Sequence, residues 1–88
     1  MRTEKMVTKF GNDSKYQVIV YGDVKKVFVS YGKKIAEVSY LSGKVTLDSK
    51  YWDYSATTGY YRNQFLGETK KETQAKIGSG EYKLKYLN

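Results

Sequence analysis

Three short turn signals, spaced ten residues apart, constrain the fold of this chain more than any other feature of its sequence. They are Gly22-Asp23, Gly32-Lys33 and Ser42-Gly43, and each separates runs rich in Val, Ile, Tyr and Phe. Two turn residues between such runs are typical of β-hairpins. The pattern predicts strands at 15–21, 24–31, 34–41 and 44–48, joined as an antiparallel meander.

The three turns together predict one shared face for these strands, because side chains along a strand alternate with a period of two. A two-residue turn at 22–23 would place Val18 opposite Val27, and a turn at 32–33 would place Val27 opposite Val38. The predicted face is apolar and carries Tyr16, Val18, Val20, Val27, Val29, Ala36, Val38, Tyr40, Val45 and Leu47. The opposite face is mixed and is expected to meet water.

Two helix signals follow the meander. Ser55, Thr57 or Thr58 can cap a first helix, with Tyr61 and Phe65 on its buried side and Gly67 at its end. Thr69 and Glu72 have the spacing of a capping box, which predicts a second helix over about 70–77. Alternating residues in 81–87 predict a final strand.

The expected fold class is therefore α+β. We predict a four-stranded antiparallel meander sheet with two short helices on its Val-rich face and a C-terminal edge strand. A length of 88 residues suits a single domain over 1–88, in which residues 1–14 are a flexible or an edge segment.

The composition excludes several classes of function. The chain has no Cys and no His, which excludes disulfides, thiolate metal sites and catalysis that depends on either residue. Asp48 and Asp53 are the nearest thing to a carboxylate pair for Mg²⁺, but Asp48 is expected to end a strand and Asp53 to cap a turn. We expect no enzyme, no cofactor and no metal. We also expect no membrane association and a location in the cytoplasm of a host bacterial cell, because no apolar run is long enough to span a bilayer or to serve as a secretory signal.

The charge of the chain is strongly positive. Sixteen Lys and Arg against nine Asp and Glu leave a net charge of +7, and all but two of the sixteen are lysines. Such a surplus is typical of proteins that bind nucleic acid, anionic membranes or acidic proteins. Lysine suits diffuse attraction to phosphates better than bidentate reading of bases. The alternative is that the lysines keep a Tyr-rich sheet soluble.

Two groups of residues are candidates for a binding site. The first group lies in and after an aromatic-rich loop, where a small core cannot absorb every ring, and it comprises Lys50, Trp52, Tyr54, Tyr60 and Arg62. Tyr60 and Arg62 are expected to point outward, and Trp, Tyr and Arg are enriched at binding hot spots. The alternative for Trp52 and Tyr54 is that they close the open end of the sheet. The second group lies on the mixed sheet face, where aromatic rings could stack on bases, and comprises Tyr21, Lys26, Phe28 and Lys44.

Four short segments carry a resemblance to a known family. They are Tyr31-Gly32-Lys33-Lys34-Ile35-Ala36, Gly43-Lys44-Val45, Tyr54-Ser55-Ala56-Thr57-Thr58 and Phe65-Leu66. Together they resemble an uncharacterised family of short proteins encoded by bacteriophages and other bacterial mobile elements, over roughly residues 28–67. The family has no catalytic residues to carry over, so the resemblance implies a phage or mobile-element origin.

Charge and implied origin together lead to one expected function and its alternatives. We expect non-catalytic binding of nucleic acid, single-stranded in preference, largely independent of sequence. The alternatives are an inhibitor that binds a host protein or ribonucleoprotein, such as a defence nuclease, in the manner of anti-CRISPR proteins, and a minor virion component. The sequence leaves the choice between DNA and RNA open, and also the oligomeric state.

Overall fold

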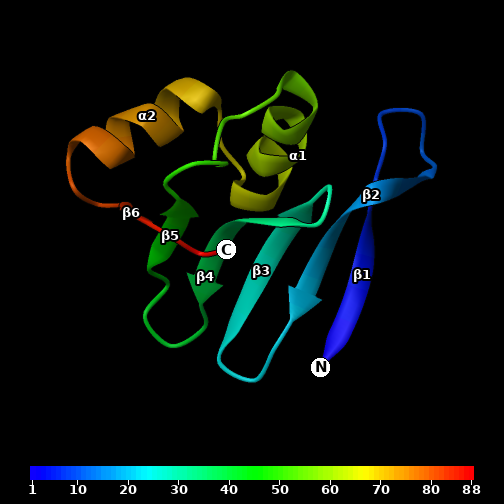
Figure 1. Cartoon of the computed structure of the whole chain (residues 1–88), viewed down its shortest axis with the longest axis horizontal. Helices are drawn as coiled ribbons and strands as arrows, with labels where there is room; N and C mark the ends of the chain where they lie inside the picture. The colour runs from blue at the N-terminus through cyan, green and yellow to red at the C-terminus, as the bar shows by residue number, and fades with distance from the viewer.

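A computed structural model describes residues 1–88 and contains a six-stranded sheet with two helices (Figure 1). In chain order the elements are β1 (Arg2–Val7), β2 (Asp13–Tyr21), β3 (Lys25–Ser30), β4 (Lys33–Ser39), β5 (Val45–Asp48), α1 (Ala56–Leu66), α2 (Lys70–Gly78) and β6 (Lys83–Lys85). The α+β class is confirmed, as are the four strands of the meander, now β2 to β5. Neither helix is long and apolar enough to cross a membrane.

The sheet differs from the prediction in its size and direction. Its strands lie side by side in chain order from β1 to β6, and β5 and β6 are parallel while all other neighbours are antiparallel. The prediction of four antiparallel strands with an appended edge strand is therefore corrected to six strands in a mixed sheet. The physical reason is that α1 and α2 form a crossover, which returns the chain to the end of the sheet where β5 began.

Both helices lie where the sequence predicts them: Ser55, one of the three N-cap candidates, caps α1, and α2 ends at Gly78, one residue beyond the predicted end. The Ser55 side chain accepts a hydrogen bond from the Thr58 amide at 3.1 Å, and Gly67 ends α1 with a φ of +70°. The Thr69 hydroxyl accepts from the Glu72 amide at 3.2 Å, while the Glu72 carboxylate accepts from the Thr69 amide at 3.0 Å. This reciprocal capping box is the one expected from the spacing.

The hairpin between β3 and β4 contains a bulge that the sequence pattern does not reveal. Its turn lies at Tyr31 and Gly32, with φ values of +52° and +77°, and not at 32–33. Val29 is opposite Lys34, but the preceding Phe28 is opposite Ala36. Ile35 is therefore an extra residue on β4, and it changes which face the rest of that strand presents.

The bulge decides which side of the sheet is buried. Phe28 and Ala36 are opposite each other, Ala36 is opposite Leu47, and all three are 0% exposed. The prediction of one Val-rich core face is therefore wrong. The extra residue shifts the register by one, so that Phe28, and not Val27 or Val29, shares the face of Ala36. On the opposite face lies a half-exposed group of valines: Val18, Val20, Val27 and Val29.

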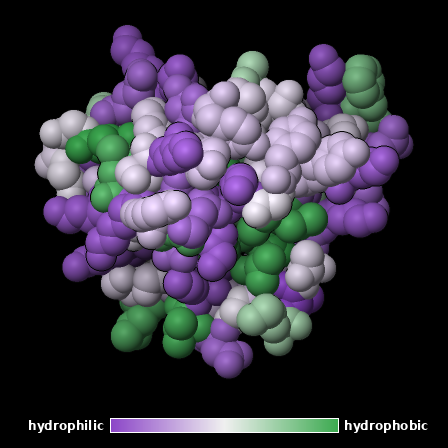
Figure 2. Space-filling model, viewed as in Figure 1, coloured by the Kyte–Doolittle hydropathy of each residue, from purple (hydrophilic) through white to green (hydrophobic).

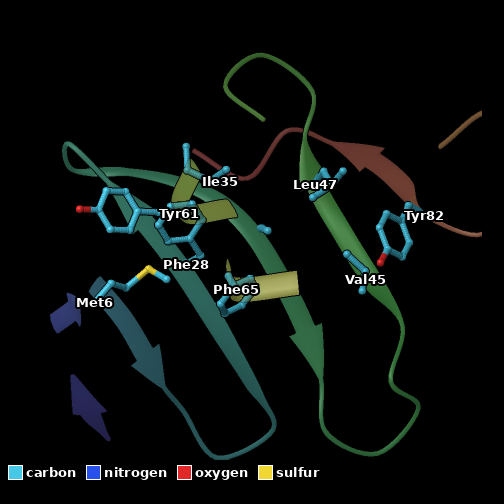
Figure 3. Close-up of a cluster of buried hydrophobic side chains, with 9 residues drawn as sticks. Met6, Phe28, Ile35, Val45, Leu47, Tyr61, Phe65 and Tyr82 are labelled. Carbon is cyan, nitrogen blue, oxygen red and sulfur yellow. The ribbon is translucent and has the colours of Figure 1, made fainter. Parts of the chain in front are cut away.

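Helix α1 covers the Phe28 face and not the Val-rich face. The rings of Phe65 and Phe28 lie 5.7 Å apart between centroids, and Figure 3 shows them facing each other in the core. The hydroxyls of Thr58 and Ser30 form a buried hydrogen bond at 2.8 Å beside this pair. Tyr61 and Phe65 are 6% and 8% exposed, which confirms the predicted buried side of α1.

Most of the surface that surrounds this core is polar. Figure 2 shows hydrophilic side chains over much of the visible face, with apolar patches at its lower end, where the hairpin turns lie in Figure 1. The high lysine content explains this colouring. Binding surfaces must therefore be sought where aromatic rings interrupt the polar cover.

Candidate nucleic-acid interface

Several connecting segments meet at one end of the sheet, the upper end in Figure 1. Strands β2 and β4 begin at this end, and strands β3 and β5 finish there. The turn at residues 31–32 and the loop at residues 49–55 therefore lie at the same end of the sheet as the start of β2. Loops held by rigid strands in this way commonly carry binding residues.

A stacked pair of tyrosines stands beside this turn. The ring centroids of Tyr16 and Tyr31 are 5.3 Å apart at an interplanar angle of 29°, and the Tyr31 amide donates to the Tyr16 carbonyl at 3.0 Å. The two side chains are 51% and 47% exposed. Tyr31 has the left-handed φ of +52°, which is rare for a bulky residue and is associated with functional sites. Both rings are exposed to water, and Tyr31 occupies a position where glycine or asparagine would fit more easily.

The buried carboxylate of Asp48 shapes the neighbouring loop. Its Oδ2 accepts from the amides of Lys50 at 3.0 Å and Tyr51 at 2.7 Å, and its Oδ1 accepts from the Leu87 amide at 2.8 Å. Burial alone would raise the pKa of Asp48, but the hydrogen bonds from these amides and from Asn88 bring it below its usual value. As predicted, Asp48 ends a strand, and its charge holds the start of the loop.

A second pair of tyrosines lies in this loop. The rings of Tyr51 and Tyr54 meet edge to face, 5.4 Å apart, and the Tyr54 hydroxyl donates to the Ser30 carbonyl at 3.3 Å. Tyr54 is 40% exposed. Because Ser30 directly precedes Tyr31, this hydrogen bond joins the loop to the turn that carries the stacked pair.

Three lysines lie over these rings. The Nζ atoms of Lys33 and Lys50 are 5.4 Å and 5.3 Å from the centroid of Tyr51, and Nζ of Lys15 is 5.4 Å from that of Tyr16. None of the three forms an ion pair with a carboxylate. We name this region the end surface, and it consists of Lys15, Tyr16, Tyr31, Lys33, Lys50, Tyr51 and Tyr54.

The structure buries Arg62, against the prediction that it points outward. Its side chain is 1% exposed, and it donates to the Trp52 carbonyl at 2.8 Å and to Asp53 Oδ1 at 3.0 Å. The guanidinium carbon also lies 5.1 Å from the half-buried Trp52 ring. The prediction failed because loop 49–55 covers a second side of α1, where Arg62 lies. Tyr60 stays 43% exposed.

The candidate residues on the sheet face do not form a common surface. Phe28 is 0% exposed beneath α1, and half-buried Lys26 has its Nζ 5.1 Å from the Phe65 ring. Tyr21 is half-buried with the Arg2 guanidinium 4.3 Å from its ring centroid. Lys44 is exposed in the β4–β5 turn at the opposite end of the sheet. The expected open face is wrong for Phe28, because the bulge at Ile35 places that side against the helix.

Sequence reasoning found part of the end surface and missed the rest. It singled out Lys50 and Tyr54 but not the stacked pair, because it assigned Tyr16 to a core face and named Tyr31 as no candidate. The neighbouring pairs Lys15-Tyr16 and Lys50-Tyr51 were a readable signal, since each puts a cation beside a ring. Their proximity in space depends on the strand register, which the sequence pattern alone did not give correctly.

The end surface has chemistry for recognition. Exposed tyrosine rings can stack on other flat π systems, and lysines that lack carboxylate partners attract anions. The nearby Asp53 is engaged by Arg62 and by Lys70, whose Nζ is 2.8 Å from Oδ2. Burial opposes ionisation of Asp53, but these two cations keep its pKa below its usual value. The carboxylate is thus committed to holding the loop.

Comparisons with known proteins place the chain in a family. No curated protein and no solved structure matches it. A family of unknown function, DUF8033, matches residues 2–81, a span that contains every element from β1 to α2 and all seven residues of the end surface. This agrees with the expectation of an uncharacterised family, and the length of the match shows that the chain belongs to the family of unknown function DUF8033.

Proposed function

We propose that this chain is a small basic phage or mobile-element protein that binds single-stranded nucleic acid without catalysis and largely independently of sequence. The observation that carries the proposal is the end surface, where exposed tyrosines lie among lysines that have no carboxylate partner. The phage origin rests on the resemblance of the turn and helix motifs. The binding proposal rests on geometry and charge.

The physical argument joins stacking to electrostatics. Every nucleobase has a π face, so stacking on Tyr16, Tyr31 or Tyr54 favours all sequences alike. Lys15, Lys33 and Lys50 would neutralise backbone phosphates and release counterions. Lysines lack the rigid fork with which arginine reads guanine, so this combination supports affinity without base specificity.

The same geometry favours single strands over duplexes. Bases within a duplex already stack on each other, so they cannot cover exposed tyrosine rings without first unpairing. Unpaired bases meet no such barrier. The end surface therefore discriminates by the availability of base faces and not by groove shape.

Fluorescence anisotropy with labelled strands of about 12 nucleotides tests the proposal, since this length lies within the usual site sizes of single-strand binders. At about 50 mM salt we expect binding to single-stranded DNA or RNA, weaker binding to duplex, and steep loss of affinity with added salt. Absent binding, or affinity that does not change with salt, would overturn the proposal.

Two triple variants that remove the same charge from different places test whether nucleic acid binds at the end surface. The triple change Lys15→Gln, Lys33→Gln and Lys50→Gln should make the slope of log affinity against log salt less negative by about 2, at about 0.7 for each phosphate contact on a single strand. The control changes three exposed lysines elsewhere, Lys5, Lys44 and Lys71, to Gln. Equal effects of the two triples would show that binding depends on net charge and not on the end surface.

A second candidate function has its own observation. At the opposite end of the sheet, Val24 is 71% exposed, Tyr40 is 47% exposed and Leu41 is 100% exposed. The Tyr40 amide donates to the Val24 carbonyl at 3.0 Å, which holds the two turns together. Such exposed apolar tips suit a pocket on a protein, as expected of an inhibitor of a host factor. This role predicts a host partner that survives nuclease treatment and is lost with Val24→Ser and Leu41→Ser.

A further inference from the structure

A cleft lies between the β1–β2 loop and the first half of α1, beside the end surface. Its volume is about 690 Å³, and its walls include Phe10 and Tyr60 together with Lys9 and Lys15. In Figure 1 the β1–β2 loop stands apart from the sheet, to the right of α1. Lys15 belongs both to this cleft and to the end surface, so a strand held on one reaches the other.

The loop displays the Phe10 ring in water by means of defined backbone contacts. The Thr8 amide donates to the Asn12 carbonyl at 2.7 Å, and the Gly11 amide donates to the Thr8 carbonyl at 3.0 Å. The Thr8 hydroxyl also accepts from the amides of Phe10 and Asn12, each at 3.3 Å. Phe10 nevertheless remains 79% exposed, so its ring is held out by an ordered loop without contributing to the core.

The opposite wall presents a second ring whose orientation is set by the core. Tyr60 is 43% exposed and meets the buried Tyr61 edge to face, with centroids 5.0 Å apart at 85°. Tyr61 itself is held in the hydrophobic core. The cleft thus has an aromatic ring on each side, one from the loop and one from α1.

We propose that this cleft receives one unstacked nucleobase of a strand whose backbone crosses the end surface. The inference rests on the proposed function and names the subsite that holds a base. Phe10 and Tyr60 provide the stacking faces, and Asn12 and Thr57 on the same walls provide hydrogen-bonding groups for the base edge. Lys9 and Lys15 supply positive charge for the adjoining phosphates.

The lining favours a nucleobase over an apolar side chain of a protein. A purely apolar occupant would make no use of the lysines and the Asn12 amide that line the cleft, whereas a nucleotide can contact rings, cations and polar groups together. The volume also falls in the range of small-molecule sites. The cleft is open enough for a base to enter from the surface without any movement of the core.

The test compares a full strand with a strand that lacks bases. Wild-type protein and the variant Phe10→Ala with Tyr60→Ala are titrated with an oligothymidine of about 12 nucleotides and with an abasic strand of equal length. The double variant should bind the oligothymidine at least tenfold more weakly, which is about 1.4 kcal/mol. It should bind the abasic strand as the wild type does, and the slope against salt should not change. The control Tyr40→Ala with Tyr86→Ala removes two other exposed rings and should alter affinity less than twofold, or about 0.4 kcal/mol.

The outcomes separate this inference from the proposed function. If the wild type binds neither strand, the proposed function fails and the subsite with it. If the wild type binds but the double variant matches it on oligothymidine, or weakens both strands equally, only the subsite is overturned. Phe10→Ser alone serves as a second variant should the double change unfold α1, because Phe10 lies in an exposed loop, and it should weaken only the base-bearing strand.

Discussion

The guanidinium of Arg62 and the carboxylate of Asp53 lie 3.0 Å apart, and they join the middle of α1 to the loop that precedes it. The arginine side chain is 1% exposed, whereas that of Asp53 is 26% exposed and also pairs with Lys70. This pair holds in place the loop that carries Tyr51 and Tyr54.

Replacing Arg62 with Met should destabilise the protein. The change leaves the Trp52 carbonyl without its donor and Asp53 with only one cation, so the free energy of unfolding should fall by about 3 kcal/mol. The control Lys70→Gln removes a half-exposed partner and should cost within about 0.5 kcal/mol. Urea denaturation measures both. A loss below about 1 kcal/mol for the arginine variant would contradict its role in holding the loop.

Acid should destabilise the fold through three carboxyls. The pKa values of Asp48 and Asp53 lie below the ordinary 3.8, and the pKa of Glu68 lies below the ordinary 4.5. Burial alone would raise all three, but hydrogen bonds, together with neighbouring cations for Asp53 and Glu68, lower them by more. A carboxyl with a lowered folded pKa stabilises the protein above its unfolded pKa and loses that contribution as the pH falls through the folded pKa. The free energy of unfolding should therefore fall between about pH 5 and pH 3.

The variant Asp48→Asn isolates one of these groups. It removes the charge that three backbone amides bind, so it should cost about 2 kcal/mol at pH 7 and make the acid slope shallower. Asp23→Asn, in an exposed turn, should stay within about 0.5 kcal/mol of the wild type. An acid slope as steep as that of the wild type in Asp48→Asn would show that Asp48 does not titrate differently on folding.

Alkali should destabilise the protein through Tyr82. Burial, followed by its 2.7 Å hydrogen bond to Glu68, raises the pKa of Tyr82 to about 12, and a hydrogen bond to Glu68 also raises the pKa of Lys76. A raised folded pKa gives stability that is present below the unfolded pKa of 10.0 and is lost as the pH rises through the folded value. Denaturation between about pH 9 and pH 12 should show this loss, and Tyr82→Phe should flatten it. An unchanged slope in that variant would refute the assignment.

Substitutions on the two faces of β3 should differ in how far they lower the free energy of unfolding. Phe28→Ala empties a site that is 0% exposed and should cost about 3–5 kcal/mol. Val27→Thr, on the half-exposed face, keeps the β-branched shape and should cost less than about 1 kcal/mol. Denaturant titration of both variants tests the buried face. The reverse order of costs would mean that the bulge at Ile35 is absent.

Substitution of Tyr31 should weaken binding of single strands and leave the free energy of unfolding nearly unchanged. Tyr31→Asn suits the left-handed φ of +52°, which offsets the lost stacking on Tyr16, so the free energy of unfolding should change by less than about 1 kcal/mol. Affinity for single strands should fall about fivefold or more, because about 1–3 kcal/mol per stacked base is at stake. Tyr31→Phe keeps the ring and should bind as the wild type does. Loss of affinity in both variants would implicate the hydroxyl and not the ring.

The sequence alone determined the features that depend on a few neighbouring residues. Gly67 and the pair Thr69 and Glu72 mark helix ends, and Ser55 was one of three candidate caps, because a cap is satisfied by hydrogen bonds within one turn of chain. The four meander strands follow from alternating apolar runs between turn residues. The strand after the helices was also visible, since its period of two is local, although only Lys83–Lys85 forms it.

The tertiary structure decided which side of the sheet is buried and which residues gather at its end. Ile35 bulges because the tight turn at Tyr31-Gly32 and the pairing of Phe28 with Ala36 must both be accommodated, and a sequence pattern cannot weigh that competition. Arg62 is buried because a loop from outside α1 supplies its acceptors. The end surface exists because the strand register brings Tyr16 to Tyr31 and Lys33 to Tyr51, across distances along the chain that no local propensity spans.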